Sequence, residues 1–185
     1  MYELEKNIFY FSRYIFKDKK ITFAMVKISL TTFRDLIEVL KQKTLKEIFL
    51  GKKVSLSRDE QVLLAEIKNN PRWFVKAGGR KGNFRKKDIV HKGRGTVYLL
   101  PSKHKNQSIL LFDDEVKIQP GPDLYLYLST KNNAKADILN LGLLKGTKGG
   151  QSYKIKKPIN QLQKYKYALI YCKKFEVLFT YAPLR

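Results

Sequence analysis

The stretch Leu124-Tyr-Leu-Tyr-Leu128 alternates two residue types over five positions. Successive side chains of a β-strand point to opposite faces, so this pattern places the leucines on one face and the tyrosines on the other. An apolar run of the same length recurs at Tyr167-Ala-Leu-Ile-Tyr171. Short runs of this kind, with turn residues between them, are typical of the strands in an all-β sandwich or barrel.

Three further apolar runs have the same character. They are Thr96-Val-Tyr-Leu-Leu100, Ser108-Ile-Leu-Leu-Phe112 and Glu176-Val-Leu-Phe-Thr180. Glycines punctuate the chain from Gly78 onward, and glycine favours tight turns between strands. We therefore predict a mainly β protein, with an antiparallel sandwich or barrel-like domain over residues 76–185.

The first 75 residues have a different pattern, which predicts a helical N-terminal region of unknown role. Between Thr31 and Phe49 the apolar residues recur every three to four positions, and this period is helical. Residues 1–24 mix aromatic and basic side chains, and they fit either a short amphipathic helix or a hairpin of two strands. We place the domain boundary near residue 75.

A second helix is predicted to begin after Ser57. The serine hydroxyl is a good N-cap, and Glu60 follows three residues later, which is the capping-box pattern. Asn69-Asn70-Pro71 is expected to end this helix. Its expected buried stripe consists of Val62, Leu63 and Ile67.

The charge of the chain indicates a class of partner only weakly. The 185 residues include 38 Lys and Arg against 16 Asp and Glu, a formal net charge of +22 at pH 7. A pI near 10 points to nucleic acid or another polyanion. However, 30 of the 38 cations are Lys, whereas readers of phosphates and bases use mainly Arg. The densest basic run, from Arg80 to Lys105, is either a solvated face or a contact for a polyanion or an anionic membrane surface.

Composition also sets several protein classes aside. One cysteine excludes an internal disulfide framework, and two histidines argue against a histidine-rich metal centre. No apolar window of about 18 residues predicts a membrane-spanning helix, and the N-terminus lacks the pattern of an export signal. We therefore expect a soluble protein without a metal site, cytoplasmic by default. No Ser/His/Asp or Cys/His spacing indicates a nucleophilic enzyme, so we expect no catalytic activity of its own.

Polar and glycine-rich segments between the expected strands are predicted to be turns. In Gln119-Pro-Gly-Pro-Asp123 the two prolines fix φ, Gly121 allows a left-handed conformation and Asp123 could cap the turn, so Gly121, Pro122 and Asp123 form a structural turn. Gly142 to Gly150 lacks the sequence of a phosphate-binding loop. The acidic cluster Asp113-Asp-Glu115 fits an exposed turn beside lysines better than an acid–base or cation site.

Cys172 is the one soft nucleophile of the chain. Alternation places it on the same strand face as Ala168 and Ile170, which suggests a buried, inert thiol with a raised pKa. Against this, Lys173 and Lys174 directly follow Cys172 in the sequence, and a nearby cation would favour the thiolate. A lone thiol can carry out one-electron or exchange chemistry, or bind a soft metal with help from another residue.

His91 is the second candidate residue. It is one of only two imidazoles in the chain, and it precedes the glycine-containing entry to a predicted strand. An imidazolium near Cys172 would stabilise the thiolate in the same way as a lysine.

Several motifs in the C-terminal part occur together in one order. They are Gly82-Asn-Phe84, His91-Lys-Gly-Arg-Gly-Thr-Val-Tyr98, Gly121-Pro-Asp-Leu-Tyr-Leu-Tyr-Leu-Ser129, Leu139-Asn-Leu-Gly-Leu-Leu-Lys-Gly146, Gly150-Gln-Ser-Tyr153 and Ile170-Tyr-Cys-Lys-Lys-Phe-Glu-Val177. In these motifs residues 79–185 resemble the electron-transfer DM-thirteen (DM13) domain. The resemblance implies a β-sandwich-like fold, a redox role centred on Cys172 and a redox partner protein. Residues 1–75 have no counterpart in it.

The leading interpretation is a non-catalytic β module with a redox or ligand-binding thiol at Cys172, and with His91 as a further contact for a cofactor. The alternative is an interaction module whose basic surface binds a polyanion, either nucleic acid or an anionic membrane surface, and whose cysteine only packs. The sequence identifies no particular cofactor and no electron donor.

Overall fold

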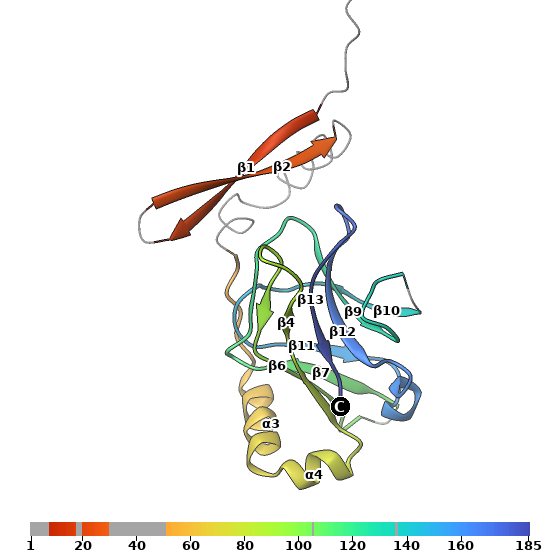
Figure 1. Ribbon diagram of the computed structural model, residues 1–185. Coiled ribbons are helices and arrows are strands. Elements are labelled where there is room, and N and C mark those ends of the chain that lie inside the picture. The colour runs from red at the N-terminus through yellow and green to blue at the C-terminus, as the bar shows by residue number, and fades with distance from the viewer. Residues whose placement is uncertain (1–7, 18–19, 30–50, 105, 136) are drawn as a thin grey trace, which may run out of the picture.

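The computed structural model describes residues 8–17, 20–29, 51–104, 106–135 and 137–185 (Figure 1). Most of the described residues from Arg80 onward belong to antiparallel strands and the turns that join them. No helix in these ranges is long and apolar enough to cross a membrane.

Two antiparallel sheets form the body of the fold. In spatial order the first contains β10 (Ile138–Leu143), β9 (Leu124–Ser129), β12 (Tyr167–Cys172), β13 (Val177–Pro183) and β4 (Arg85–Lys86). The second contains β11 (Gln151–Ile155), β7 (Ser108–Phe112), β6 (Thr96–Pro101) and β3 (Arg80–Asn83). Two further pairs are β5 (Gly93–Arg94) with β8 (Lys117–Ile118), and β1 (Ile8–Lys17) with β2 (Lys20–Ser29).

The main core lies between the two sheets. Leu126 and Ile170 from the first sheet share one buried cluster with Leu99 and Phe112 from the second. The alternation in β9 is confirmed, because all three of its leucines belong to this cluster. The predicted class, a mainly β antiparallel sandwich with helices toward the N-terminus, is therefore confirmed.

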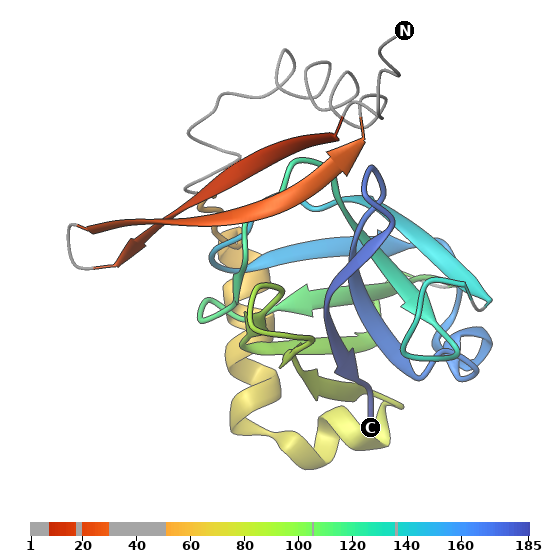
Figure 2. The ribbon, with the colours of Figure 1, turned by 45° about the horizontal axis from the view of Figure 1, so that its top comes forward.

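Two helices cover the outer face of the second sheet (Figure 2). They are α3 (Arg58–Asn69) and α4 (Pro71–Lys76). A second buried cluster joins them to β6 and β7, and it contains Leu56, Leu64, Ile67, Phe74, Tyr98, Leu100 and Leu111. The second sheet is thus buried on both faces. A short 3₁₀ helix, η1 (Ile159–Leu162), precedes β12.

The predicted start of α3 is confirmed, and its predicted buried stripe is wrong in part. Ser57 accepts a hydrogen bond from the Glu60 backbone N–H, and the Glu60 side chain accepts one from the Ser57 N–H, so the capping box is complete. Leu64 and Ile67 face the sheet, whereas Val62 is 62% exposed. Residues two positions apart in an α-helix lie about 200° apart around its axis, so Val62 and Leu64 cannot face the same sheet.

Asn70 and Pro71 end one helix and begin another. The sequence predicts only the end, but the Asn70 side chain accepts a hydrogen bond from the Trp73 N–H and so caps α4. Proline is favourable at the first helical position, where no backbone N–H is required. For the described part of residues 1–24, the antiparallel pair of β1 and β2 agrees with the predicted pair of strands and not with a helix. The helix predicted over residues 31–49 lies outside the described residues.

Residues 51–76 belong structurally with the sandwich. The Val54 N–H donates to the Lys148 carbonyl at 2.9 Å, and Lys53 pairs with Lys148 in a parallel bridge. These contacts join the segment to the loop between β10 and β11, and the buried residues of α3 and α4 join it to the second sheet. The domain boundary near residue 75 is not tested by these contacts and stays a prediction.

Candidate functional site

Cys172 is the last residue of β12, and its side chain is fully buried. It belongs to the main core, together with Ala168 and Ile170 from the same strand, so the predicted orientation of this strand is confirmed. In the ladder Cys172 pairs with Leu124 of β9 and with Val177 of β13. The thiol therefore lies at the end of the central strand of the first sheet.

Three backbone N–H groups act on the sulfur of Cys172. Those of Lys174 and Phe175 come from the turn into β13, in which Glu176 adopts the left-handed region with φ 52°. The third belongs to Asp123. Burial raises the pKa of the thiol, the three N–H groups oppose this rise, and the Asp123 carboxylate adds to it. The net pKa is raised, so the thiol is protonated at neutral pH, and the three donors would stabilise any negative charge that develops on it.

The cations after Cys172 do not give the thiol a low pKa. The Lys173 ammonium lies over the ring of Tyr125, 5.6 Å from its centroid, and the Lys173 N–H donates to the Asp123 carbonyl at 3.0 Å. Of the two alternatives considered from the sequence, the raised pKa agrees with the buried thiol and not with activation by a neighbouring cation.

Gly121 is required for a reason other than the one predicted. Its φ is not in the left-handed region, so the expected conformation is wrong. A Cβ atom at this position would lie 2.7 Å and 2.8 Å from two carbons of the Phe179 ring. The turn before β9 therefore passes too close to an aromatic ring for any side chain. Pro122 is buried beside it.

His91 lies against the same phenyl ring. Its imidazole meets Phe179 edge-on, with the centroids 4.7 Å apart, and its Nδ1 is 2.8 Å from Asp88 Oδ2. Asp88 also accepts hydrogen bonds from the His91 and Val90 N–H groups, and the His91 N–H contributes most to lowering the Asp88 pKa to about 2. These side-chain contacts of His91 do not include the Cys172 sulfur.

Phe179 is the residue that sequence reasoning missed. Its ring packs against both His91 and Gly121, so it joins two candidate residues that are far apart in the chain. Asp123 then connects this turn to Cys172 through its N–H and carboxylate. The available signal was the alternation in Val177-Leu-Phe179, which places Phe179 on the same strand face as Val177. That pattern does not show which residues the ring contacts.

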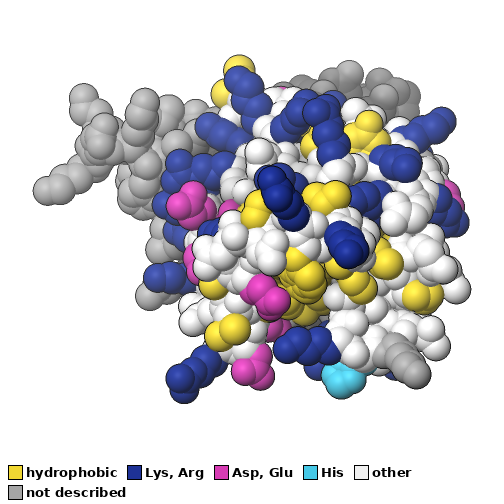
Figure 3. All heavy atoms as spheres, turned by 90° about the horizontal axis from the view of Figure 1, so that it is seen from below, with side chains coloured by type: hydrophobic (Ala, Val, Ile, Leu, Met, Phe, Trp, Pro, Cys, Tyr) yellow, Lys and Arg dark blue, Asp and Glu magenta, His cyan; other side chains and the backbone are white. Residues whose placement is uncertain are grey.

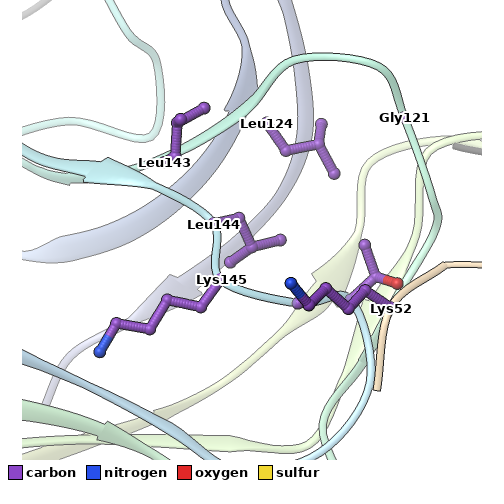
Figure 4. Close-up of a pocket in the computed structure, with 8 residues that line it drawn as sticks. Lys52, Gly121, Leu124, Leu143, Leu144 and Lys145 are labelled. Carbon is purple, nitrogen blue, oxygen red and sulfur yellow. The ribbon is translucent and has the colours of Figure 1, made fainter. Parts of the chain in front are cut away.

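A small cavity opens beside the 119–123 turn (Figure 4). Its volume is about 150 Å³, below the roughly 300–1,000 Å³ of pockets that enclose drug-sized ligands. In the close-up the Lys145 side chain points away from Leu124 and Leu144. The Lys145 ammonium instead donates to the Ser152 carbonyl. Within the described residues, no group of three or more His, Cys, Asp or Glu side chains is arranged to hold a metal ion.

The remaining sequence candidates have structural roles. The segment from Gly142 ends β10 and forms a loop before β11, as predicted, and the Gln151 side chain holds it through the Gly146 backbone N–H and carbonyl. The acidic cluster is exposed only in part. Asp114 and Glu115 form an exposed turn, as predicted. Asp113 is 5% exposed and accepts a hydrogen bond from the Thr96 N–H at 3.1 Å, so the prediction is wrong for this residue.

The basic surface is dispersed. Figure 3 shows Lys and Arg side chains scattered over one face of the molecule, with hydrophobic side chains between them. Arg80, which begins the densest basic run, is half-buried, and its guanidinium donates to the carbonyls of Leu162 and Tyr165. Charge density along the chain therefore does not locate a binding surface.

Comparison with known proteins supports a family assignment. A family model described as Electron transfer DM13 matches residues 83–184. Searches of the curated proteins and of the solved structures each gave no match. The matched range includes His91, the 121–123 turn, Cys172 and Phe179, and it covers more than half of the chain. The chain therefore belongs to the DM13 electron-transfer family.

Proposed function

We propose that this chain is a non-catalytic electron-transfer module whose redox group is the Cys172 thiol. The family supports electron transfer as the general function. Two features support the choice of residue: the sulfur is fully buried, and the backbone N–H groups of Phe175, Asp123 and Lys174 oppose the rise in its pKa that burial causes. Hydrogen bonds to sulfur are among the factors that set the potentials of iron–sulfur clusters, and the same donors would stabilise charge on a thiol sulfur.

The proposed step transfers one electron and one proton. The Cys172 S–H bond breaks and leaves a thiyl radical. The electron passes to an oxidised partner protein that accepts one electron, and the proton passes to the Asp123 carboxylate, whose charge acts on the sulfur. The Asp123 carboxyl then releases this proton to water. Return of the electron from the reduced partner, with a proton taken up from water through Asp123, restores the thiol.

Burial supports a reversible role for this thiol. Oxidation of cysteine to sulfenic and higher acids follows thiolate character and exposure, and Cys172 is fully buried with a raised pKa. The chain contains no second cysteine that could resolve the oxidised sulfur as an internal disulfide.

Protein-film voltammetry of the purified full chain tests this proposal. Metal content and the visible spectrum are measured first, and they also test the predicted contacts of His91 and Cys172 with a cofactor. We expect a one-electron wave for the wild-type protein whose potential falls by about 59 mV per pH unit below the thiol pKa, because one proton leaves with each electron. Cys172→Ser should abolish the wave, although it keeps an acceptor for the three N–H groups.

Two outcomes would contradict the proposal. A wave that persists in Cys172→Ser would place the redox group elsewhere, and no wave in the wild-type protein would remove the thiol from electron transfer. Asp123→Asn adds a separate test of the proton acceptor. This variant should keep the wave and slow the exchange of electrons, because the leaving proton has lost its nearby carboxylate.

A second proposal is that the basic surface binds a polyanion. One observation favours it. Within the described ranges, exposed cations such as Arg94, Lys117 and Lys148 form no ion pair, whereas His91 pairs with Asp88 and Lys164 with Asp137. The charges of Arg94, Lys117 and Lys148 are thus not neutralised by ion pairs with described residues. Binding to heparin or nucleic acid that weakens with rising salt would support this proposal, and the absence of such binding at low salt would contradict it.

A further inference from the structure

Four cations occupy directly paired positions on adjacent backbone segments. Arg94 of β5 pairs with Lys117 of β8, Lys117 pairs with Lys148, and Lys148 pairs with Lys53. Directly paired residues of a sheet project to the same face. Lys53, Lys148, Lys117 and Arg94 therefore form a line on one face of this small sheet, here named the cation row. All four residues are exposed.

The backbone bonds fix the geometry of the row. The Ile118 N–H donates to the Thr147 carbonyl, and the Gly149 N–H donates to the Val116 carbonyl. These bonds lie on either side of the Lys117–Lys148 pair, so this is a non-hydrogen-bonded antiparallel pair, the kind in which facing side chains lie closest. Val116 and Ile118 are buried on the opposite face, so Lys117 between them is directed outward.

Without a bound ligand, repulsion within the cation row destabilises the folded protein. Like charges directly opposite each other destabilise a sheet. None of the four cations forms an ion pair with a residue in the described ranges. Adjacent strands lie about 4.8 Å apart, so the row spans about 15 Å, a length over which a linear polyanion presents more than one phosphate. A bound chain of phosphates would offset the repulsion along its whole length.

We propose that the cation row binds the phosphates of a linear polyanion, either a nucleic-acid strand or inorganic polyphosphate. This inference rests on the second proposal above and names its site and ligand class. A line of cations fits a chain of phosphates better than the plane of a bilayer. Three of the four residues are Lys, whose compact charge contacts phosphate without reading bases.

Fluorescence anisotropy of the full chain with a labelled 20-nucleotide oligothymidine tests the row. The row variant carries Lys53→Gln, Lys117→Gln and Lys148→Gln. The control variant carries Lys68→Gln, Lys131→Gln and Lys154→Gln at three other exposed sites, so both variants lose the same net charge.

We expect the row variant to bind at least about tenfold more weakly at 0.1 M salt. The slope of log K against log salt should become shallower by about 2, since each phosphate contact on a single strand contributes about 0.7. The control variant should bind within about twofold of the wild-type protein. The melting temperature of the row variant should equal or exceed that of the wild type, which would show that lost binding is not lost folding.

Each other outcome overturns a stated part of the inference. Equal losses in both variants would overturn the row and leave diffuse polyanion binding intact, whereas no wild-type binding would overturn both. Polyphosphate should displace the oligonucleotide, and its failure to do so would overturn phosphate recognition. Binding only to vesicles of phosphatidylcholine with phosphatidylglycerol would overturn the inference, because the basic residues would then bind an anionic membrane surface and not a linear polyanion.

Discussion

At the scale of single residues, Gly121 shows how a close approach can require glycine where φ does not. The Phe179 ring occupies the place of its missing side chain. We expect Gly121→Ala to lower the free energy of unfolding by about 1–3 kcal/mol, the usual cost of overpacking a core. Phe179→Leu should cost stability alone but relieve part of the loss when combined with Gly121→Ala. Denaturant unfolding of the four proteins measures this coupling, and strictly additive losses would contradict the contact.

The Cys172 thiol predicts a pH dependence of stability. Burial raises its pKa in the folded protein, so folding is favoured by the protonated thiol. This contribution is fully present below the ordinary thiol pKa and is lost as pH rises through the raised value. The difference in unfolding free energy between wild type and Cys172→Ser should therefore be constant near pH 7 and shrink above about pH 9. A difference that stays constant up to pH 10.5 would show that the thiol pKa is not raised.

At the scale of elements, the start of α3 is a small network rather than a single cap. Burial alone would raise the pKa of Glu60, but hydrogen bonds from Ser152 and Ser57 hold it below its ordinary value. The carboxylate thus closes the capping box and also accepts a hydrogen bond from the Ser152 hydroxyl on β11.

We expect Ser57→Ala to lower the free energy of unfolding by about 1 kcal/mol at pH 7, as is usual for loss of an N-cap. The matched control is Ser55→Ala, two residues earlier and exposed. Because the Glu60 pKa is depressed, its contribution is present above the ordinary carboxyl pKa and lost as pH falls through the folded value. Urea unfolding at pH 7 and pH 3 should show this loss, and equal effects of the two serine variants would contradict the cap.

The elements that could be predicted from sequence are those with strong local patterns. β9 and β12 carry apolar alternation, and Ser57 with Glu60 gives a complete start signal for α3. β10 was missed because Asn140 and Gly142 interrupt it at a register shift. β5 and β8 are two residues each, too short to carry a period.

The features of the candidate site that could be predicted are likewise those with a local sequence pattern. The burial of Cys172 follows from alternation along its own strand, and it was predicted. The contacts of Phe179 with His91 and Gly121 join segments far apart in sequence, and one sequence holds no local signal for them. The cation row depends in the same way on which short segments pair.

At the scale of the whole molecule, the second sheet depends on both of its faces. Its inner face packs against the first sheet, and its outer face buries Tyr98, Leu100 and Leu111 beneath α3 and α4. A fragment that begins at residue 76 would expose these three side chains. A fragment that begins at residue 51 keeps both helices and the contacts of Val54.

We expect residues 51–185 to fold cooperatively and residues 76–185 to be strongly destabilised. Full burial of a large apolar side chain is worth about 1.5–3 kcal/mol, so exposing the outer face costs on the order of 5 kcal/mol. A domain of this size has a total stability of only about 5–15 kcal/mol. Thermal unfolding by circular dichroism compares the two fragments. Equal melting temperatures would place the boundary near residue 75, as the sequence pattern predicts, because α3 and α4 would then contribute nothing that the sandwich needs.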